Sequence, residues 1–173
     1  MCVRWRARWC FLRPSPSTAP EPLIAEAVND TDRDVRRMAC QMVFPKAIAK
    51  YEPLIAGAVN DTDRDVRQMA CQMVFPKAIA KYGTRMFPLL SKVLEDIDWQ
   101  VRRDAVEKAL PEALNQSADR AKPFVDGALS DTQWPVRLQA CKKLLPKAME
   151  CFGARMIAQI REGLVDENID VRK

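Results

Sequence analysis

The sequence predicts an all-α chain of about four and a half helix pairs stacked side by side. Three observations predict this fold class. The 173 residues are 48% hydrophobic, enough to bury a core, and the presence of only 5 Gly disfavours a turn-rich β architecture. One frame recurs along the chain at a nearly constant interval. Within each copy, the apolar residues follow helical spacing and not the alternation of a strand.

The recurring frame is clearest in two near-identical segments. Residues 22–51, PLIAEAVNDTDRDVRRMACQMVFPKAIAKY, recur at 53–82 with two changes, Glu26 to Gly57 and Arg37 to Gln68. A Val-Arg step marks the frame at intervals of 31, 35, 35 and 35 residues. It stands at Val35-Arg36, Val66-Arg67, Val101-Arg102, Val136-Arg137 and Val171-Arg172. The units we expect are at about 19–51, 52–82, 83–117 and 118–152, with a partial unit at 153–173.

Residues 1–18 precede the first unit and are predicted to be a basic leader or a disordered tail. The first twenty residues contain four Arg and no acidic residue, whereas the rest of the chain holds 24 Lys and Arg against 23 Asp and Glu. The net charge of +5 therefore belongs mainly to this leader. An acid-free segment rich in Arg is one mark of an organelle-targeting peptide, so targeting and disorder stay open as two interpretations.

The first helix of each unit is predicted from an apolar stripe. In unit three the stripe comprises Leu89, Leu90, Val93 and Leu94. This i, i+1, i+4, i+5 spacing places the four side chains on one face of a helix. The opposite face is free to meet water.

A polar turn and a second helix complete each unit. Thr31 with Asp34 is predicted to form a capping box in which Asp replaces the usual Glu. The second helix begins near Val35, and its apolar residues cover a broad arc, as expected for a helix buried between two neighbours. Pro45 and its counterparts, ten residues after each Val, are predicted to kink this helix on its outward side. A break before a short third helix is the alternative.

The pattern Asp-x-Asp-x-x-Val-Arg-x-x-Ala between two amphipathic helices resembles the HEAT repeat family of α-solenoids. The resemblance covers about residues 19–173 and implies stacked antiparallel helix pairs with the second helices lining one surface. It says little about function, because that family includes phosphatase scaffolds, nuclear transport receptors, chromatin proteins and a few enzymes.

Charged residues recur in the same frame. The Arg after each Val projects inside the apolar arc of its helix, so burying it is costly unless it has a partner. An Asp recurs in each inter-helix turn and can supply that partner. The expected ladder comprises Arg36, Arg67, Arg102 and Arg137 with Asp30, Asp61, Asp96 and Asp131. HEAT-like proteins often contain such a ladder, so we interpret these residues as joining neighbouring units and not as a ligand site.

Candidate partner-binding residues lie on the second helices of the first two units. They are Met38, Met42, Met69 and Met73. The equivalent residues in units three and four are Asp104, Lys108, Gln139 and Lys143. Projected outward, the Met would form an adaptable apolar patch suited to a partner helix. A helix phase shifted by one step would place them in the core instead.

Two Trp are further candidates for partner binding. Trp99 and Trp134 stand two residues before the Val in units three and four, where the first two units have Arg33 and Arg64. Each ring can fasten its own turn to the start of the helix. The alternative is an interaction edge, because Trp is favoured in binding hot spots.

Composition limits the function classes. The chain has no His, which excludes Ser-His-Asp or Cys-His catalysis and His-ligated metal sites. No residue set suggests a catalytic site, a metal or a cofactor. Cys40, Cys71 and Cys141 share one core position and fit a reducing, intracellular setting, most simply the cytoplasm.

The sequence therefore favours a non-catalytic scaffold or adaptor that binds another protein or a larger assembly. A nucleic-acid-associated HEAT-like protein and a HEAT-like lyase are the alternatives. The fifth unit stops two residues after Val171. This predicts an uncovered apolar face, as in a fragment, a truncated product or a chain that docks on another subunit.

Overall fold

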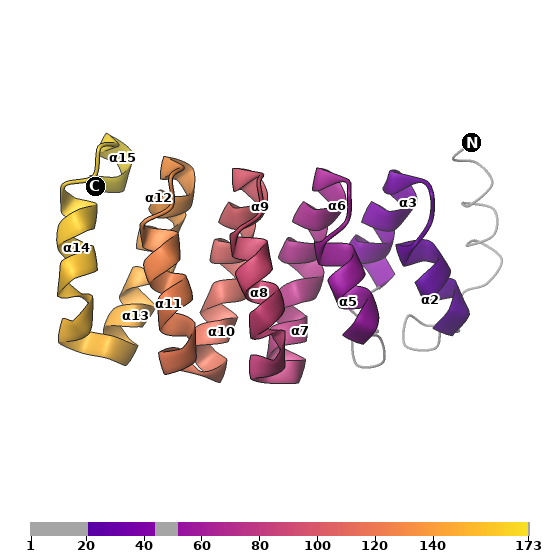
Figure 1. The fold of residues 1–173 in the computed structure, drawn as a ribbon, viewed down its shortest axis with the longest axis horizontal. Helices are drawn as coiled ribbons and strands as arrows, with labels where there is room; N and C mark the ends of the chain where they lie inside the picture. The colour runs from indigo at the N-terminus through magenta and orange to yellow at the C-terminus, as the bar shows by residue number, and fades with distance from the viewer. Residues whose placement is uncertain (1–20, 44–51, 173) are drawn as a thin grey trace.

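The computed structural model describes residues 21–43 and 52–172. Within these residues the chain forms helices and turns and no strand, so the predicted all-α solenoid is confirmed. The helix pairs follow one another along the long axis of the molecule, with α2 at one end of the stack and α15 at the other (Figure 1). The predicted leader, residues 1–18, and the first proline of the series, Pro45, lie outside the described residues.

The first helices of the successive pairs form one row of the stack. They are α2 (Glu21–Val28), α5 (Glu52–Val59), α8 (Phe87–Leu94), α11 (Ala118–Leu129) and α14 (Ile157–Leu164). The apolar stripe predicted in unit three faces inward, because Leu90 and Val93 are buried and Leu89 and Leu94 pack against the same core. Phe87 of α8 and Phe124 of α11 meet edge to face, with ring centroids 5.8 Å apart, and so join neighbouring units.

The second helices form the other row, and in units two, three and four the structure describes an upper and a lower part of each. The upper parts are α3 (Arg33–Met38), α6 (Arg64–Met69), α9 (Trp99–Asp104), α12 (Trp134–Lys143) and α15 (Ile169–Arg172). The lower parts are α7 (Phe75–Tyr82), α10 (Leu110–Gln116) and α13 (Leu145–Phe152). Large, fully buried side chains from both rows fill the space between them, among them Ile55, Phe75, Leu110 and Leu144.

A π-helical turn connects the two parts of the second helix in units two and three. It spans Ala70–Val74 in one unit and Ala105–Ala109 in the next, and the amide of Phe75 donates to the carbonyl of Ala70, five residues earlier. Pro76 lies in the first turn of α7, and as a proline it has no N–H to donate to the preceding π-helical turn. The chain therefore stays helical past the proline in these units, as the predicted kink requires. In unit four a single turn residue, Leu144, separates α12 from α13.

Two glycines end lower helices in a conformation that L-residues rarely adopt. Gly83 has φ +61° and Gly153 has φ +53°. Each opens a 3-10 turn, Gly83–Met86 or Gly153–Met156, that leads into the next first helix. Left-handed φ values favour Gly because it lacks Cβ. These turns supply four extra residues in two of the three 35-residue intervals. In the third, from Val101 to Val136, the first helix is longer instead: α11 has 12 residues where α8 has 8.

Candidate functional site

The Arg–Asp ladder links each unit to the next. The Nε and Nη2 atoms of Arg102 donate to the two carboxylate oxygens of Asp131, each at 2.8 Å. The Nη1 atom of the same guanidinium donates to the carbonyl of Asp96 in its own turn, at 2.7 Å. The same arrangement joins Arg36 to Asp61, Arg67 to Asp96 and Arg137 to Asp166.

These guanidinium groups are fully engaged within the protein. Their side chains are between 12% and 15% exposed, and their Asp partners are equally shielded. The fork of two parallel N–H···O bonds is the strongest geometry that an Arg–carboxylate pair adopts. Hydrogen bonding to Asp131 raises the pKa of Arg102 above its ordinary value, although burial opposes this. The geometry supports a role in joining units, because all three guanidinium nitrogens of Arg102 donate hydrogen bonds within the protein.

The residues at the two ends of the ladder, Asp30 and Arg172, keep the contacts within their own turns. Asp30, in the first described turn, accepts a hydrogen bond from the amide of Asp32 at 2.8 Å. At the other end, the Nη1 atom of Arg172 donates to the carbonyl of Glu167 and, more closely, to that of Asp166. Both residues therefore hold the local turn geometry that the interior members share.

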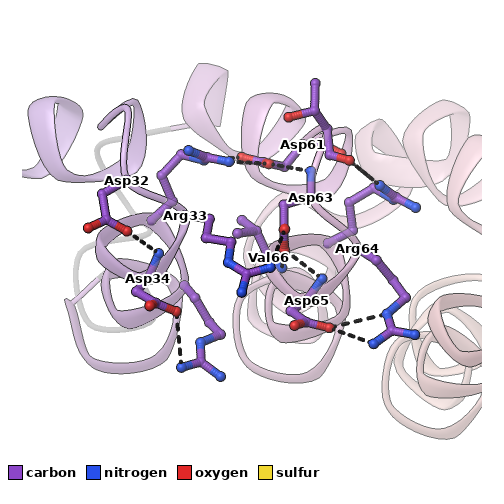
Figure 2. A network of polar contacts seen from close by, with 12 residues as sticks. Asp32, Arg33, Asp34, Asp61, Asp63, Arg64, Asp65 and Val66 are labelled. Carbon is purple, nitrogen blue, oxygen red and sulfur yellow. Dashed lines mark hydrogen bonds and ion pairs between the residues drawn. The ribbon is translucent and has the colours of Figure 1, made fainter.

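The turns are capped by Asp and not by the Thr that the sequence suggested. Asp32 accepts from the amide of Asp34 at 2.9 Å and is the N-cap of α3, so the predicted Thr31 capping box is wrong. Asp63 caps α6 in the same way, accepting from Asp65 and Val66 (Figure 2). The shift has a simple cause. The preceding Asp of each turn binds the amide of the capping Asp, which moves the cap one residue along the chain.

Four side chains, each seven residues after the repeated Val, form a row that we call the Met–Lys row. It consists of Met42, Met73, Lys108 and Lys143. Met42 is 57% exposed and Met73 is 37% exposed. Both Lys are exposed as well. The predicted outward direction therefore holds for this frame position in all four units.

The other two Met occupy a different kind of position. Met69 is only partly exposed and packs against the core, so its predicted outward placement is wrong. Met38, at the same frame position in the first described pair, is 48% exposed. This position lies three residues after the Val and about 40° around the helix from the Met–Lys row. That rotation turns it toward the preceding unit and away from solvent.

Asp104 shows what the residue three positions after the repeated Val contacts. It is 2% exposed and is the only buried charged residue in the described part of the chain. Its Oδ2 atom accepts from the side-chain amides of Gln68 and Gln72 of the preceding unit, each at 2.7 Å. Its Oδ1 atom accepts from Arg103 at 2.8 Å. The expected outward placement of Asp104 is therefore wrong.

One sequence signal pointed to this network. Between the two near-identical units only two positions differ, and one of them changes Arg37 to Gln68. Gln68 is the residue that meets Asp104. The change from Arg37 to Gln68 therefore marks the place where unit two contacts unit three, whose sequence differs from that of the two near-identical units.

The two Trp have unequal surroundings. Trp99 packs against the core, and the guanidinium of Arg103 lies 5.5 Å from its ring centroid. Trp134 is 42% exposed. Ile97, in the turn before α9, is 95% exposed, and Ile169, the first residue of α15, is 59% exposed. The exposed apolar surface of the turns thus includes Trp134 but not the whole of Trp99.

The Cys side chains at the repeated core position are not activated for chemistry. Cys40 and Cys71 are fully buried, and Cys141 is partly buried. Burial raises the pKa of the Cys40 thiol to about 12 and raises that of Cys71 further. Both thiols are therefore protonated at neutral pH and act as small apolar side chains. No group of His, Cys, Asp and Glu in the described residues is arranged to hold a metal ion.

Stacked helix pairs joined by a repeated ion pair define this chain as an α-solenoid repeat protein. A family model of HEAT repeats matches residues 20–111, more than half of the chain. The chain therefore belongs to the HEAT repeat family, and the helix pairs continue beyond the matched segment to residue 172. No curated protein matches the sequence. None of the described helices has both the length and the apolar character needed to cross a bilayer.

Proposed function

We propose that residues 19–173 act as one non-catalytic scaffold or adaptor domain that binds another protein through its second helices. The observation that carries the proposal is the exposure of Met42 and Met73 at one frame position of successive units. A single exposed apolar side chain is ordinary on a protein surface, whereas a repeated one makes a continuous strip. HEAT repeats generally mediate protein–protein interaction, which agrees with this use of the surface.

Met suits such a surface for a physical reason. Its unbranched side chain and polarisable sulfur adapt to differently shaped apolar partners at little cost. The same frame position holds Lys108 and Lys143 in the next units, so the fold does not need an apolar residue there. The Met side chains are thus available for a partner and are dispensable for the core.

The turns offer a second candidate surface. Ile97 in the turn before α9, and Trp134 and Ile169 at the starts of α12 and α15, are exposed in three successive units. Trp commonly contributes much of the energy of an interface. We propose this edge as the site to test next if replacing Met42 and Met73 leaves partner binding unchanged.

The Met42→Lys/Met73→Lys double variant tests the main proposal. Folding should survive, because both changes copy residues found at this position in units three and four. Capture of the partner from an extract of the source cells should fall about tenfold or more, about 1.4 kcal/mol. A photo-crosslinking amino acid at position 73 should give a discrete adduct, and one at Lys92, on the exposed side of α8, serves as the control.

Two results would contradict the proposal. If the double variant loses its helical circular dichroism, the Met side chains are structural. If it folds and captures the partner normally, Met42 and Met73 do not contact the partner.

A further inference from the structure

The Met–Lys row changes character halfway along the stack. Units one and two present Met42 and Met73, and units three and four present Lys108 and Lys143 at the same frame position. Since the position relative to the repeat is constant, one elongated ligand can meet all four side chains in order. The row therefore specifies a sequence of contacts, apolar at one end and basic at the other.

The basic half has cationic groups to offer. Lys142 and Lys143 are both exposed on α12 and form no ion pair within the described residues. Lys108 contacts Glu107 at 2.8 Å, yet its side chain is 50% exposed. An ion pair so open to water contributes little, so it exchanges readily for another carboxylate. The complementary ligand carries negative charge opposite units three and four.

A nucleic acid fits this surface poorly. Phosphate binding requires basic side chains along the whole contact, and Met42 and Met73 provide none. A protein segment that carries both apolar and acidic side chains matches the row better.

The spacing of the units suggests the form of that segment. Packed helices lie about 8–10 Å apart, and an α-helix rises 1.5 Å per residue. A helix lying along the stack therefore advances by about five to seven residues between units, up to one heptad. It can present one side chain of the same face to each unit.

We propose that the Met–Lys row binds an acidic amphipathic helix of a partner protein. Apolar side chains in the first half of that helix contact Met42 and Met73, and carboxylates one heptad apart in the second half contact Lys108 and Lys143. The inference rests on the proposed function and adds the chemistry and order of the ligand.

Two synthetic probes of equal composition test the order of contacts. Both are fluorescein-labelled helical peptides of about four heptads that differ only at the contact positions. The ordered probe carries Leu, Leu, Glu and Glu at these positions, and the alternating probe carries Leu, Glu, Leu and Glu. The full chain should bind the ordered probe about tenfold more tightly in fluorescence anisotropy, about 1.4 kcal/mol.

A matched variant reverses the expected preference. Met73→Lys combined with Lys108→Met makes the row alternate without changing its composition or the net charge of the protein. Each new residue already occupies this frame position in a neighbouring unit. The variant should therefore fold, as judged by circular dichroism and its urea midpoint, and should prefer the alternating probe.

Three outcomes would overturn the inference. One is the absence of probe binding to the wild-type chain, and another is a probe preference that the variant does not change. The third is displacement of the ordered probe by mixed-sequence duplex DNA at a lower concentration than unlabelled probe requires. If partner capture still depends on Met42 and Met73 in these cases, the proposed function stands and only the order of contacts is wrong. If capture does not depend on them either, both fail.

Discussion

A ladder arginine stabilises two different structures with one side chain. Through Nη1 it closes the turn of its own unit, and through Nε and Nη2 it holds the Asp of the next unit. Removing the guanidinium therefore leaves a shielded carboxylate and a turn carbonyl without their donor. The cost of such a loss exceeds the net gain from forming the pair, because the remaining groups stay desolvated.

We expect Arg102→Ala and Asp131→Ala each to lower the free energy of unfolding by about 1–3 kcal/mol. A double-mutant cycle from urea denaturation measures the coupling between them. The pair Arg33–Asp63, whose atoms are 3.4 Å apart and whose Arg side chain is 64% exposed, is the internal control. Its coupling should stay below about 1 kcal/mol. If the two pairs have equal coupling free energies, shielding the Arg102–Asp131 pair from solvent does not strengthen it.

The ladder also predicts how stability depends on pH. Hydrogen bonds from Arg137 hold the pKa of Asp166 below its ordinary value of 3.8, and the amide of Asn168 adds to the effect while burial opposes it. A carboxyl whose pKa is lower when folded stabilises the protein above its unfolded pKa, and this contribution is lost as the pH falls through the folded pKa. Asp166→Asn should therefore destabilise the protein clearly at pH 7 and progressively less below about pH 4. Urea midpoints of both proteins between pH 7 and pH 3 check this, and a gap that stays constant would contradict it.

At the scale of elements, the starts of the second helices differ in how they are capped. Asp98 accepts from the amide of Gln100 at 2.8 Å at the start of α9. Gln133 occupies the same position before α12, but its side chain makes no capping bond. Pro135, two residues later, has no N–H to offer. The fold therefore contains a capped and an uncapped version of one helix start.

This difference gives a matched pair of variants. Asp98→Ala should cost about 0.5–2 kcal/mol, the usual effect of losing an N-cap side chain. Gln133→Ala should change the free energy of unfolding by less than about 0.5 kcal/mol, since no cap is lost. Thermal or urea denaturation measures both. Similar losses in the two variants would mean that the Asp98 cap does not stabilise α9.

The sequence predicted the helix pairs well but their ends less well. Period and apolar spacing are local properties, so the repeat frame and the inward stripe of α8 were visible without a structure. Whether Thr31 or Asp32 caps α3 depends on the tight path of the turn, because either side chain can accept the bond. Only the folded turn shows that Asp30 already binds the amide of Asp32.

At the scale of the whole molecule, the relation between neighbouring units decides which side chains are surface. The residues of the ladder could be named from the sequence, but the direction of each pairing, from one unit to the next, required the structure. Likewise, Met69 and Met73 lie on almost the same side of one helix, yet Met69 is partly buried against the core and Met73 is more exposed. The rotation between units determines this, and no pattern within a single unit encodes it.

The doubled segment has a consequence for the length of the stack. Residues 22–52 could be lost as a block and Glu21 would be joined to Pro53, which restores the Glu-Pro-Leu-Ile-Ala sequence that begins both copies. The remaining unit would still carry Gln68 and Gln72 beneath Asp104, so the junction with unit three would be unchanged. Unequal recombination within the coding sequence can therefore add or remove one Met of the Met–Lys row at a time. The reach of this surface can then evolve in whole-unit steps, while the contacts between units two and three are kept.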